Sequence, residues 1–261
     1  LAGGIPIVVP MQAPSAEQPL YRVDWQRVRD AVSPRTRMLM LNFPHNPTGI
    51  ILGESDLDAL EALVRDTGIM LLADEVYEHI VFDGNTHQSV ARRESLAANA
   101  IVISSFGKTY HTTGWKIGYC CAPKALTAEI RKVHQFMVFT VSSPMQFALA
   151  HYMRDPAPYL GLSDFYQKKR DRLHSGLSTT RFNPLPSQGT FFLLADYQQV
   201  SDLPEAEFAH WLTTQHGVTV IPVSAFYQDP GAPGSNHQLI RFCFAKQDHT
   251  LDAAVAKLAG I

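Results

Sequence analysis

Three short apolar runs occur at even intervals in the first half of the chain, at residues 38–41, 69–73 and 100–103. Each run is apolar at successive positions, which is typical of strands that are covered on both faces. Between the first two runs, residues 53–68 carry leucines near helical spacing, and Gly68 closes the segment. A strand, a helix and a strand at about 30 residues per unit predict a βαβ arrangement in a parallel sheet.

A fourth apolar run, at 117–122, follows the third after a short segment without helical periodicity. A parallel return needs a long crossover, usually a helix, so we expect this strand to be antiparallel. Downstream, the pattern predicts one or two helices over 127–153, with a break near Pro144, and a long helix over 159–178. The remaining predicted elements are strands at 190–195, 218–222 and 238–244, and a helix near 204–215.

These elements predict an α/β fold, in which a mostly parallel sheet is sandwiched by helices, followed by a small α+β domain. We place the large domain at 1–157, an interdomain helix at 158–178 and the small domain at 179–261. The length of 261 residues fits one large domain or two unequal ones. A hydrophobic content of 46% supplies ample material for a packed core.

Charge and cysteine content exclude several classes of protein. The 22 Lys and Arg residues are balanced by 24 Asp and Glu residues, whereas an electrostatic nucleic-acid binder should show a basic excess. Three cysteines cannot form a disulfide framework, which favours a reducing, cytoplasmic compartment. Cys120 and Cys121 lie in a predicted strand, and we expect both thiols to be buried. No apolar run approaches the roughly 18 residues that a membrane span requires.

Polar residues follow the predicted parallel strands at the point where each strand ends. Asn46 follows the first strand, Asp74 and Tyr77 follow the second, and Ser105 and Lys108 follow the third. Each has a simpler interpretation, as a turn, a helix N-terminus, a packing residue or a surface lysine. Ligands in open α/β sheets bind outside the carboxyl ends of the strands, so the convergence of these residues at one edge predicts a binding site.

Two other motifs compete for Lys108. The string Gly107-Lys108-Thr109 resembles the end of a P-loop, but that motif needs a glycine where this chain has Val102. Ser105 and Lys108 also match the S-x-x-K of serine acyl enzymes, whose S-D-N and K-T-G partner motifs do not occur here. The 11 histidines are scattered without zinc-ligand spacing, so we predict no metal site.

Four signatures occur in order: N-P-T-G, D-E-V-Y, S-S-F-G-K with G-W-K-I-G, and a late arginine in a strand. This set resembles the class I aminotransferases, which are pyridoxal-phosphate enzymes of the aspartate-aminotransferase fold type. The phrasing is most similar to the methionine and kynurenine (glutamine) aminotransferase branch. The resemblance covers essentially the whole chain, and several separate signatures in the right order make it specific.

The resemblance implies a role for each residue around the cofactor ring. Lys108 would form the Schiff base with pyridoxal phosphate and then move the substrate Cα proton, which needs an amine with a lowered pKa. Asp74 would pair with the pyridine nitrogen and keep it protonated, so that the ring accepts electrons. Tyr77 and Asn46 would donate hydrogen bonds to the phenolic oxygen of the cofactor.

The same resemblance implies which residues bind the cofactor phosphate and the substrate carboxylate. Ser105 and Lys116 would bind the phosphate. Many relatives have arginine at the position of Lys116, so here a point charge replaces a bidentate fork. Arg241, in a predicted strand, would bind the substrate carboxylate through a fork-shaped pair. The resemblance also implies that Asn46 is a substrate-binding residue.

These assignments predict transamination between an apolar or aromatic L-amino acid, methionine-like, and a 2-oxo acid. The resemblance also implies a homodimer, while the charge balance and the short apolar runs predict that the protein binds neither nucleic acid nor membrane. One alternative is a pyridoxal-phosphate C–S β-lyase, because the same cofactor chemistry can eliminate a β-substituent. A second is a truncated remnant that keeps the fold without activity.

The chain starts L-A-G-G-I-P-I-V-V-P, without Met and without the basic region of a signal peptide. By resemblance, the first two strands of the family's sheet and a Gly-rich phosphate-binding turn belong before this start. We therefore expect a partial chain, with two strand edges that lack their partners.

Overall fold

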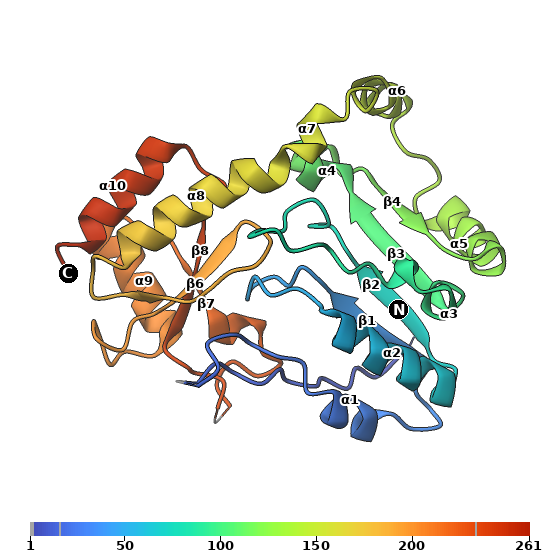
Figure 1. Cartoon of the computed structure of the whole chain (residues 1–261), viewed down its shortest axis with the longest axis horizontal. Helices are drawn as coiled ribbons and strands as arrows, with labels where there is room; N and C mark the ends of the chain where they lie inside the picture. Colours follow the sequence, from blue (N-terminus) through green and yellow to red (C-terminus); the bar gives the residue numbers. More distant parts are fainter. Residues whose placement is uncertain (1–2, 16, 233) are drawn as a thin grey trace. The chain divides into compact units, whose positions relative to one another are not determined.

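The computed structural model describes residues 3–15, 17–232 and 234–261 (Figure 1). Contacts group the chain into two compact units. The parallel-sheet unit contains residues 32–44 and 51–163. The C-terminal-sheet unit contains Leu1–Ala31, His45–Ile50 and Asp164–Ile261. The expected domain boundaries near 157 and 178 stay a prediction.

The parallel-sheet unit is built on four strands in the order β1-β2-β3-β4. Strands β1 and β2 pair in parallel, β2 and β3 pair in parallel, and β3 and β4 pair antiparallel. This arrangement confirms the predicted parallel run and the antiparallel fourth strand, whose short connection excludes a crossover. The bounds are β1 (Met38–Asn42), β2 (Met70–Asp74), β3 (Ala100–Ser105) and β4 (Gly118–Cys121).

Helix α2 (Glu54–Thr67) connects β1 to β2, as its leucine spacing predicts. Its buried side chains share one face, and they are Leu57, Leu60, Leu63 and Val64. Gly68 ends the helix with a left-handed φ of 67°, and its N–H bonds to the carbonyl of Val64. Two short helices, η1 (Val90–Arg92) and α3 (Glu94–Ala97), precede β3.

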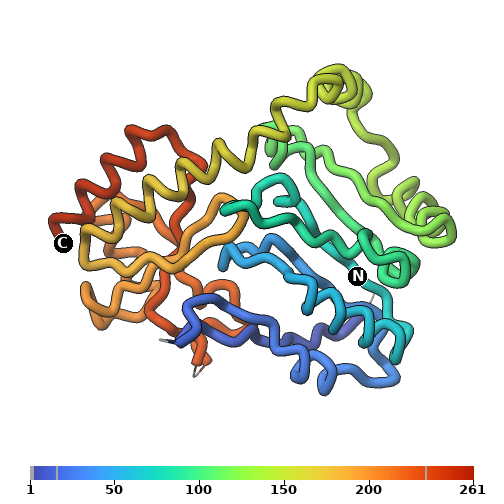
Figure 2. Tube along the Cα trace, viewed as in Figure 1, coloured from blue at the N-terminus to red at the C-terminus, as the bar shows by residue number. Residues whose placement is uncertain are grey.

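Three helices follow β4, and Figure 2 traces them from green to yellow. They are α5 (Lys124–Met137), α6 (Ser143–Tyr152) and α7 (Ala157–Leu160). The predicted break near Pro144 is confirmed, because α5 ends at Met137 and Pro144 lies in the first turn of α6. No helix among the described residues is long and apolar enough to cross a membrane.

The expectation that Cys120 and Cys121 are buried is wrong. All four residues of β4 are exposed, and both thiols are exposed with them. The reason is the position of β4, which is an edge strand with a partner on one side only. In β2 and β3, buried residues alternate with partly exposed ones, so successive apolar residues do not mean equal burial on both faces.

Helices α5 and α6 and the residues between them expose an unusual amount of apolar side chain. No residue of α5 is buried, and Phe136, Phe139 and Phe147 are 85%, 79% and 78% exposed. We call this set, together with Val133, Met137 and Val138, the α5–α6 apolar face. Large apolar side chains that are exposed together in one stretch of chain favour an interaction site.

The C-terminal-sheet unit has a second sheet, in the order β5-β6-β8-β7, and all of its pairs are antiparallel. Its strands are β5 (Asn183–Pro184), β6 (Phe192–Asp196), β7 (Ile221–Pro222) and β8 (Leu239–Cys243). The helices of this part of the chain are α1 (Trp25–Ala31), α8 (Leu162–Leu177), α9 (Glu205–His216) and α10 (Asp248–Leu258), with the short helix η3 (Val223–Phe226). The predicted α+β pattern is confirmed, and β5, only two residues long, was not predicted.

A compact core holds this second sheet. Leu193, Ala195 and Ile240 have no exposed surface, and the rings of Tyr197 and Phe208 stack with centroids 3.9 Å apart. The buried phenylalanine of α9 therefore joins the helix to the end of β6.

Candidate active site

Asp74 is the last residue of β2, and its carboxyl group is half-buried. One oxygen, Oδ1, accepts the N–H of Val76 at 3.3 Å. Asn42, at the end of β1, donates to the main-chain oxygen of Asp74 at 3.2 Å. Burial raises the pKa of Asp74 above its ordinary value, although the Val76 N–H and the charge of Lys108 act in the opposite direction. This carboxylate therefore lacks full solvation and favours a cationic partner.

Lys108 lies in the short helix α4 (Phe106–Thr109), which directly follows β3. Its Nζ is 5.8 Å from the ring centroid of Tyr77, and the tyrosine is buried. The backbone next to this lysine is closely packed, because a Cβ on Gly107 would come within 2.9 Å of the Cα of Thr113. The structure therefore brings together Asp74, Tyr77 and Lys108, all three predicted from the strand ends.

The segment after Lys108 has an unusual backbone. His111 and Lys116 both adopt a left-handed φ of 55°, which is costly for residues other than glycine and is common at functional sites. Ser105 is paired with Gly118 in the antiparallel register, which holds Lys116 at the same end of the β3–β4 pair as Ser105. Among the described residues, no group hydrogen-bonds the buried hydroxyl of Thr112. The connection between β3 and β4 thus carries Lys116 and a buried hydroxyl that has no partner among the described residues.

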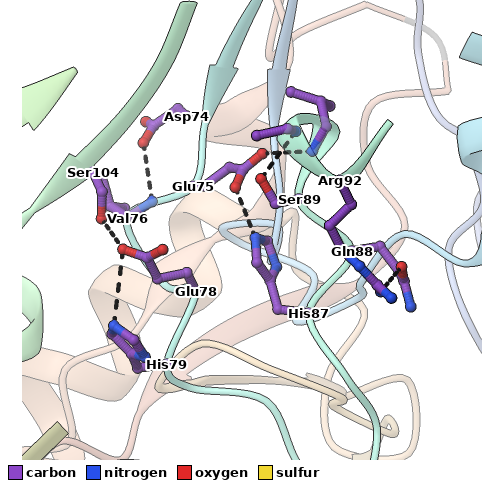
Figure 3. A network of polar contacts seen from close by, with 12 residues as sticks. Asp74, Glu75, Val76, Glu78, His79, His87, Gln88, Ser89, Arg92 and Ser104 are labelled. Carbon is purple, nitrogen blue, oxygen red and sulfur yellow. Dashed lines mark hydrogen bonds and ion pairs between the residues drawn. The ribbon is translucent and has the colours of Figure 1, made fainter. Parts of the chain in front are cut away.

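Two carboxylates anchor the residues between Asp74 and Glu78, which we call the 74–78 turn (Figure 3). Glu75 is 3% exposed, accepts the N–H of Val90 at 3.0 Å and bonds to Nε2 of His87 at 2.8 Å. Neither Glu75 nor His87 was predicted as a site residue, since the motif D-E-V-Y gives no sign of which acidic side chain turns inward.

Glu78 anchors the other end of the same turn. Its Oε1 accepts the hydroxyl of Ser104, as Figure 3 shows. The same oxygen accepts the hydroxyl of Tyr119 at 2.7 Å. Burial, followed by the bond to Glu78, raises the pKa of Tyr119 to about 12, so this phenol stays protonated and donates at neutral pH. The turn that carries Tyr77 is thus tied to β3 and β4.

Glu75→Ala is expected to lower the free energy of unfolding by about 2 kcal/mol, because it leaves the buried Val90 N–H and the His87 ring without an acceptor. Urea denaturation of the purified variant measures this change. Glu94→Ala, at an exposed residue of α3, is the matched control and should shift the midpoint far less. Equal shifts of the urea midpoint in the two variants would contradict a stabilising role for the buried Glu75 carboxylate.

Arg241 projects from β8 in the C-terminal-sheet unit and contacts three side chains. Its Nη1 donates to Oδ1 of Asn46 at 2.6 Å. Its guanidinium carbon lies 3.9 Å from the ring centroid of Phe192 and 5.0 Å from that of Phe226. Cation–π contacts of this kind orient the guanidinium and exclude water from it. We call these four residues the Arg241 cluster; Phe192 and Phe226 were not predicted, because nothing in their local sequence marks them.

The loop that presents Asn46 is closely packed. Nδ1 of His45 bonds to the Thr48 hydroxyl at 2.8 Å, and burial lowers the pKa of His45 to about 4, so the imidazole is neutral. Gly49 has a φ of 71°, and a Cβ there would meet the Ser187 hydroxyl at 2.3 Å. The N-P-T-G glycine is therefore required by its backbone and by this close approach.

Comparison with known proteins identifies the family. The family model for aminotransferase class I and II matches residues 1–258. Methionine aminotransferase from Escherichia coli is 48% identical over 259 residues, which cover 99% of this chain and 65% of that protein. The chain belongs to the class I and II aminotransferases. The resemblance drawn from the four motifs is thereby confirmed.

Further members of this family agree. Kynurenine–oxoglutarate transaminase 1 from Mus musculus is 32% identical over 99% of this chain and 66% of its own length. The structure of N-succinyldiaminopimelate aminotransferase from Mycobacterium tuberculosis superposes with a TM-score of 0.90 at 36% identity, covering 97% of this chain and 65% of that one. The chain thus spans just under two thirds of these relatives. Family members use pyridoxal 5′-phosphate.

Proposed function

We propose that the protein is a pyridoxal-phosphate-dependent aminotransferase that exchanges the amino group of an L-amino acid with a 2-oxo acid. The observation that carries this proposal is the Lys108 amine beside the Tyr77 ring and the half-buried Asp74 carboxylate, at the carboxyl end of β2 and β3. When bound, pyridoxal phosphate supplies the electron sink that makes the substrate Cα–H bond acidic.

The donor groups of the chain fit this cofactor. Lys108 would hold it through its amine and afterwards carry the Cα proton as a general base. Asp74, whose burial disfavours an unpaired charge, would gain a cationic partner in the protonated ring nitrogen. The Tyr77 hydroxyl and the Asn46 amide would donate to the phenolic oxygen.

The phosphate and the substrate carboxylate would have separate donors. Ser105 and Lys116 would bind the phosphate at the end of the β3–β4 pair, where the Thr112 hydroxyl also lacks a partner among the described residues. Arg241 would bind the substrate carboxylate, with Asn46 occupying one of its N–H groups.

The preferred substrate, on this proposal, has an apolar or aromatic side chain like that of methionine. The name of the Escherichia coli relative and the two phenylalanine rings against Arg241 support this choice. A panel of methionine, phenylalanine, kynurenine and aspartate, each with a 2-oxo acid acceptor, tests it. Amino transfer from methionine or an aromatic amino acid, with aspartate a poor donor, is the expected result.

The same panel separates the alternatives. Release of pyruvate and a thiol from cystathionine without an acceptor would indicate a C–S β-lyase, and absence of all turnover would indicate an inactive remnant. No comparison favours either.

We also propose a cytoplasmic homodimer. The three free cysteines are consistent with a reducing compartment, and the α5–α6 apolar face supplies surface for association, which sedimentation velocity measures.

A further inference from the structure

Glu205 is a buried acidic residue with no role so far. It is the first residue of α9 and is 1% exposed. Its Oε1 accepts the main-chain N–H groups of His237 at 2.9 Å and Leu239 at 3.0 Å, and its Oε2 accepts the N–H of Ser224. Three charge-assisted bonds therefore join one carboxylate to two separate segments of backbone.

Those two segments carry members of the Arg241 cluster. Ser224 belongs to η3 and lies two residues before Phe226. Leu239 begins β8 and lies two residues before Arg241. Phe226 is 42% exposed, so packing alone does not fix its ring against the guanidinium. Strand β7 already pairs with β8 next to η3, through Pro222 and Ile240. The bonds of Glu205 to Ser224 and Leu239 add a second link between η3 and β8, close to the 5.0 Å contact between the Phe226 ring and Arg241.

We propose that Glu205 is a positioning residue for carboxylate recognition, acting through the Arg241 cluster. This inference rests on the proposed function. An arginine recognises a carboxylate through directional N–H bonds, and a small displacement of its plane weakens that pair. Asn46 holds one edge of the guanidinium, and the two phenylalanine rings limit its rotation.

Glu205→Gln tests the role with little change in shape. An amide has one oxygen and one NH₂ group, so its NH₂ must face a backbone N–H that formerly found an acceptor. One of the two segments is then released. The Michaelis constants for the amino acid and the 2-oxo acid should rise together by about tenfold, with kcat changed by less than about threefold.

A carboxylate without an amino group gives a readout independent of turnover. The affinity for 3-phenylpropanoate, measured by calorimetry, should fall by the same factor of about ten in Glu205→Gln. The absorbance titration of pyridoxal phosphate should be unchanged, because Glu205 belongs to the C-terminal-sheet unit, whereas Asp74, Tyr77 and Lys108 belong to the parallel-sheet unit. Glu207→Gln, at an exposed residue in the same helical turn, is the matched control and should leave all three quantities as in the wild type.

A double-mutant cycle separates positioning from general stability. Phe226→Leu should raise the same Michaelis constants about fivefold, and Phe226→Tyr should restore them. Combined with Glu205→Gln, Phe226→Leu should add less than its separate effect, because both changes act through the same contact. Fully multiplicative effects would overturn the proposal.

Other outcomes also decide it. Unchanged Michaelis constants in Glu205→Gln, or equal losses of kcat and of cofactor affinity, would overturn the inference. If neither Glu205→Gln nor Glu205→Asp folds, the carboxylate serves the fold as a whole and the inference is again overturned. Absence of amino transfer in both wild type and Glu207→Gln would instead refute the proposed function. The affinity for 3-phenylpropanoate would then still test the positioning role of Glu205, because that measurement does not depend on turnover.

Discussion

Lys108→Ala is expected to abolish amino transfer, with a loss of at least about 10⁴-fold in the single-turnover rate. The variant removes the amine that lies near Tyr77 and whose charge acts on Asp74. On the proposed function, it would remove both the covalent attachment of the cofactor and the base for the Cα proton. Stopped-flow absorbance with a saturating amino acid measures the loss, and the cofactor's visible absorbance band should shift to that of unattached pyridoxal phosphate.

Lys132→Ala is the matched control for this variant. Lys132 is exposed on α5 and pairs with Glu129 at 2.7 Å, so its removal changes the net charge equally without touching the site. Turnover and absorbance of this control should equal those of the wild type. Retention of both properties in Lys108→Ala would refute the assignment of this lysine and, with it, the proposed reaction.

Asp74→Asn is expected to weaken cofactor binding by about 10- to 100-fold and to slow Cα deprotonation by about 100-fold or more. A neutral amide cannot hold a proton on the ring nitrogen, so the ring accepts electrons less well. Cofactor titration measures the first effect, and single-turnover kinetics at saturating cofactor measure the second. An unchanged single-turnover rate would exclude Asp74 as the partner of the ring.

The same variant should have the opposite effect on the stability of the cofactor-free protein. Burial raises the pKa of Asp74 above its ordinary value of 3.8, so the folded state disfavours the ionised form. Between pH 3.8 and the raised pKa the folded state binds more protons than the unfolded state, and this group makes stability fall as pH rises through that window. Cofactor-free Asp74→Asn should therefore melt above the wild type at pH 7.

This stability difference should shrink below pH 3.8, where the wild-type carboxyl is protonated in both the folded and the unfolded state. Thermal unfolding at pH 7 and at pH 3.5 tests the sign. Asp202→Asn, at an exposed residue, is the control and should show no such pH-dependent gain. A lower melting temperature for Asp74→Asn at pH 7 would mean that the fold stabilises the charge.

Local signals were sufficient to predict much of this protein. Apolar runs bounded by turn residues located β1, β2 and β3, and the short connection predicted an antiparallel β4. Asp74, Tyr77 and Lys108 followed from the rule that strand ends bear ligands. These inferences need only residues that lie close together along the chain.

Contacts between distant residues were beyond the reach of such signals. Arg241 and Asn46 are 195 positions apart, and nothing near either residue indicates that they bond to each other. Glu205 sits in a helix start, where an acidic residue is ordinarily solvated and interacts with the helix dipole, so its burial depends on two backbone segments far along the chain. Exposure of Cys120 likewise depends on what lies beside β4, which the strand's own residues do not encode.

The α5–α6 apolar face has a consequence for the behaviour of the protein in solution. Water contact with Phe136, Phe139 and Phe147 grows more unfavourable on warming from low temperature, and sulfate strengthens the same tendency. Self-association of the chain should therefore increase between 4 and 25 °C. The protein should also precipitate at a low concentration of ammonium sulfate. Cold, low-sulfate buffers should therefore weaken association through this face, which sedimentation velocity at the two temperatures measures.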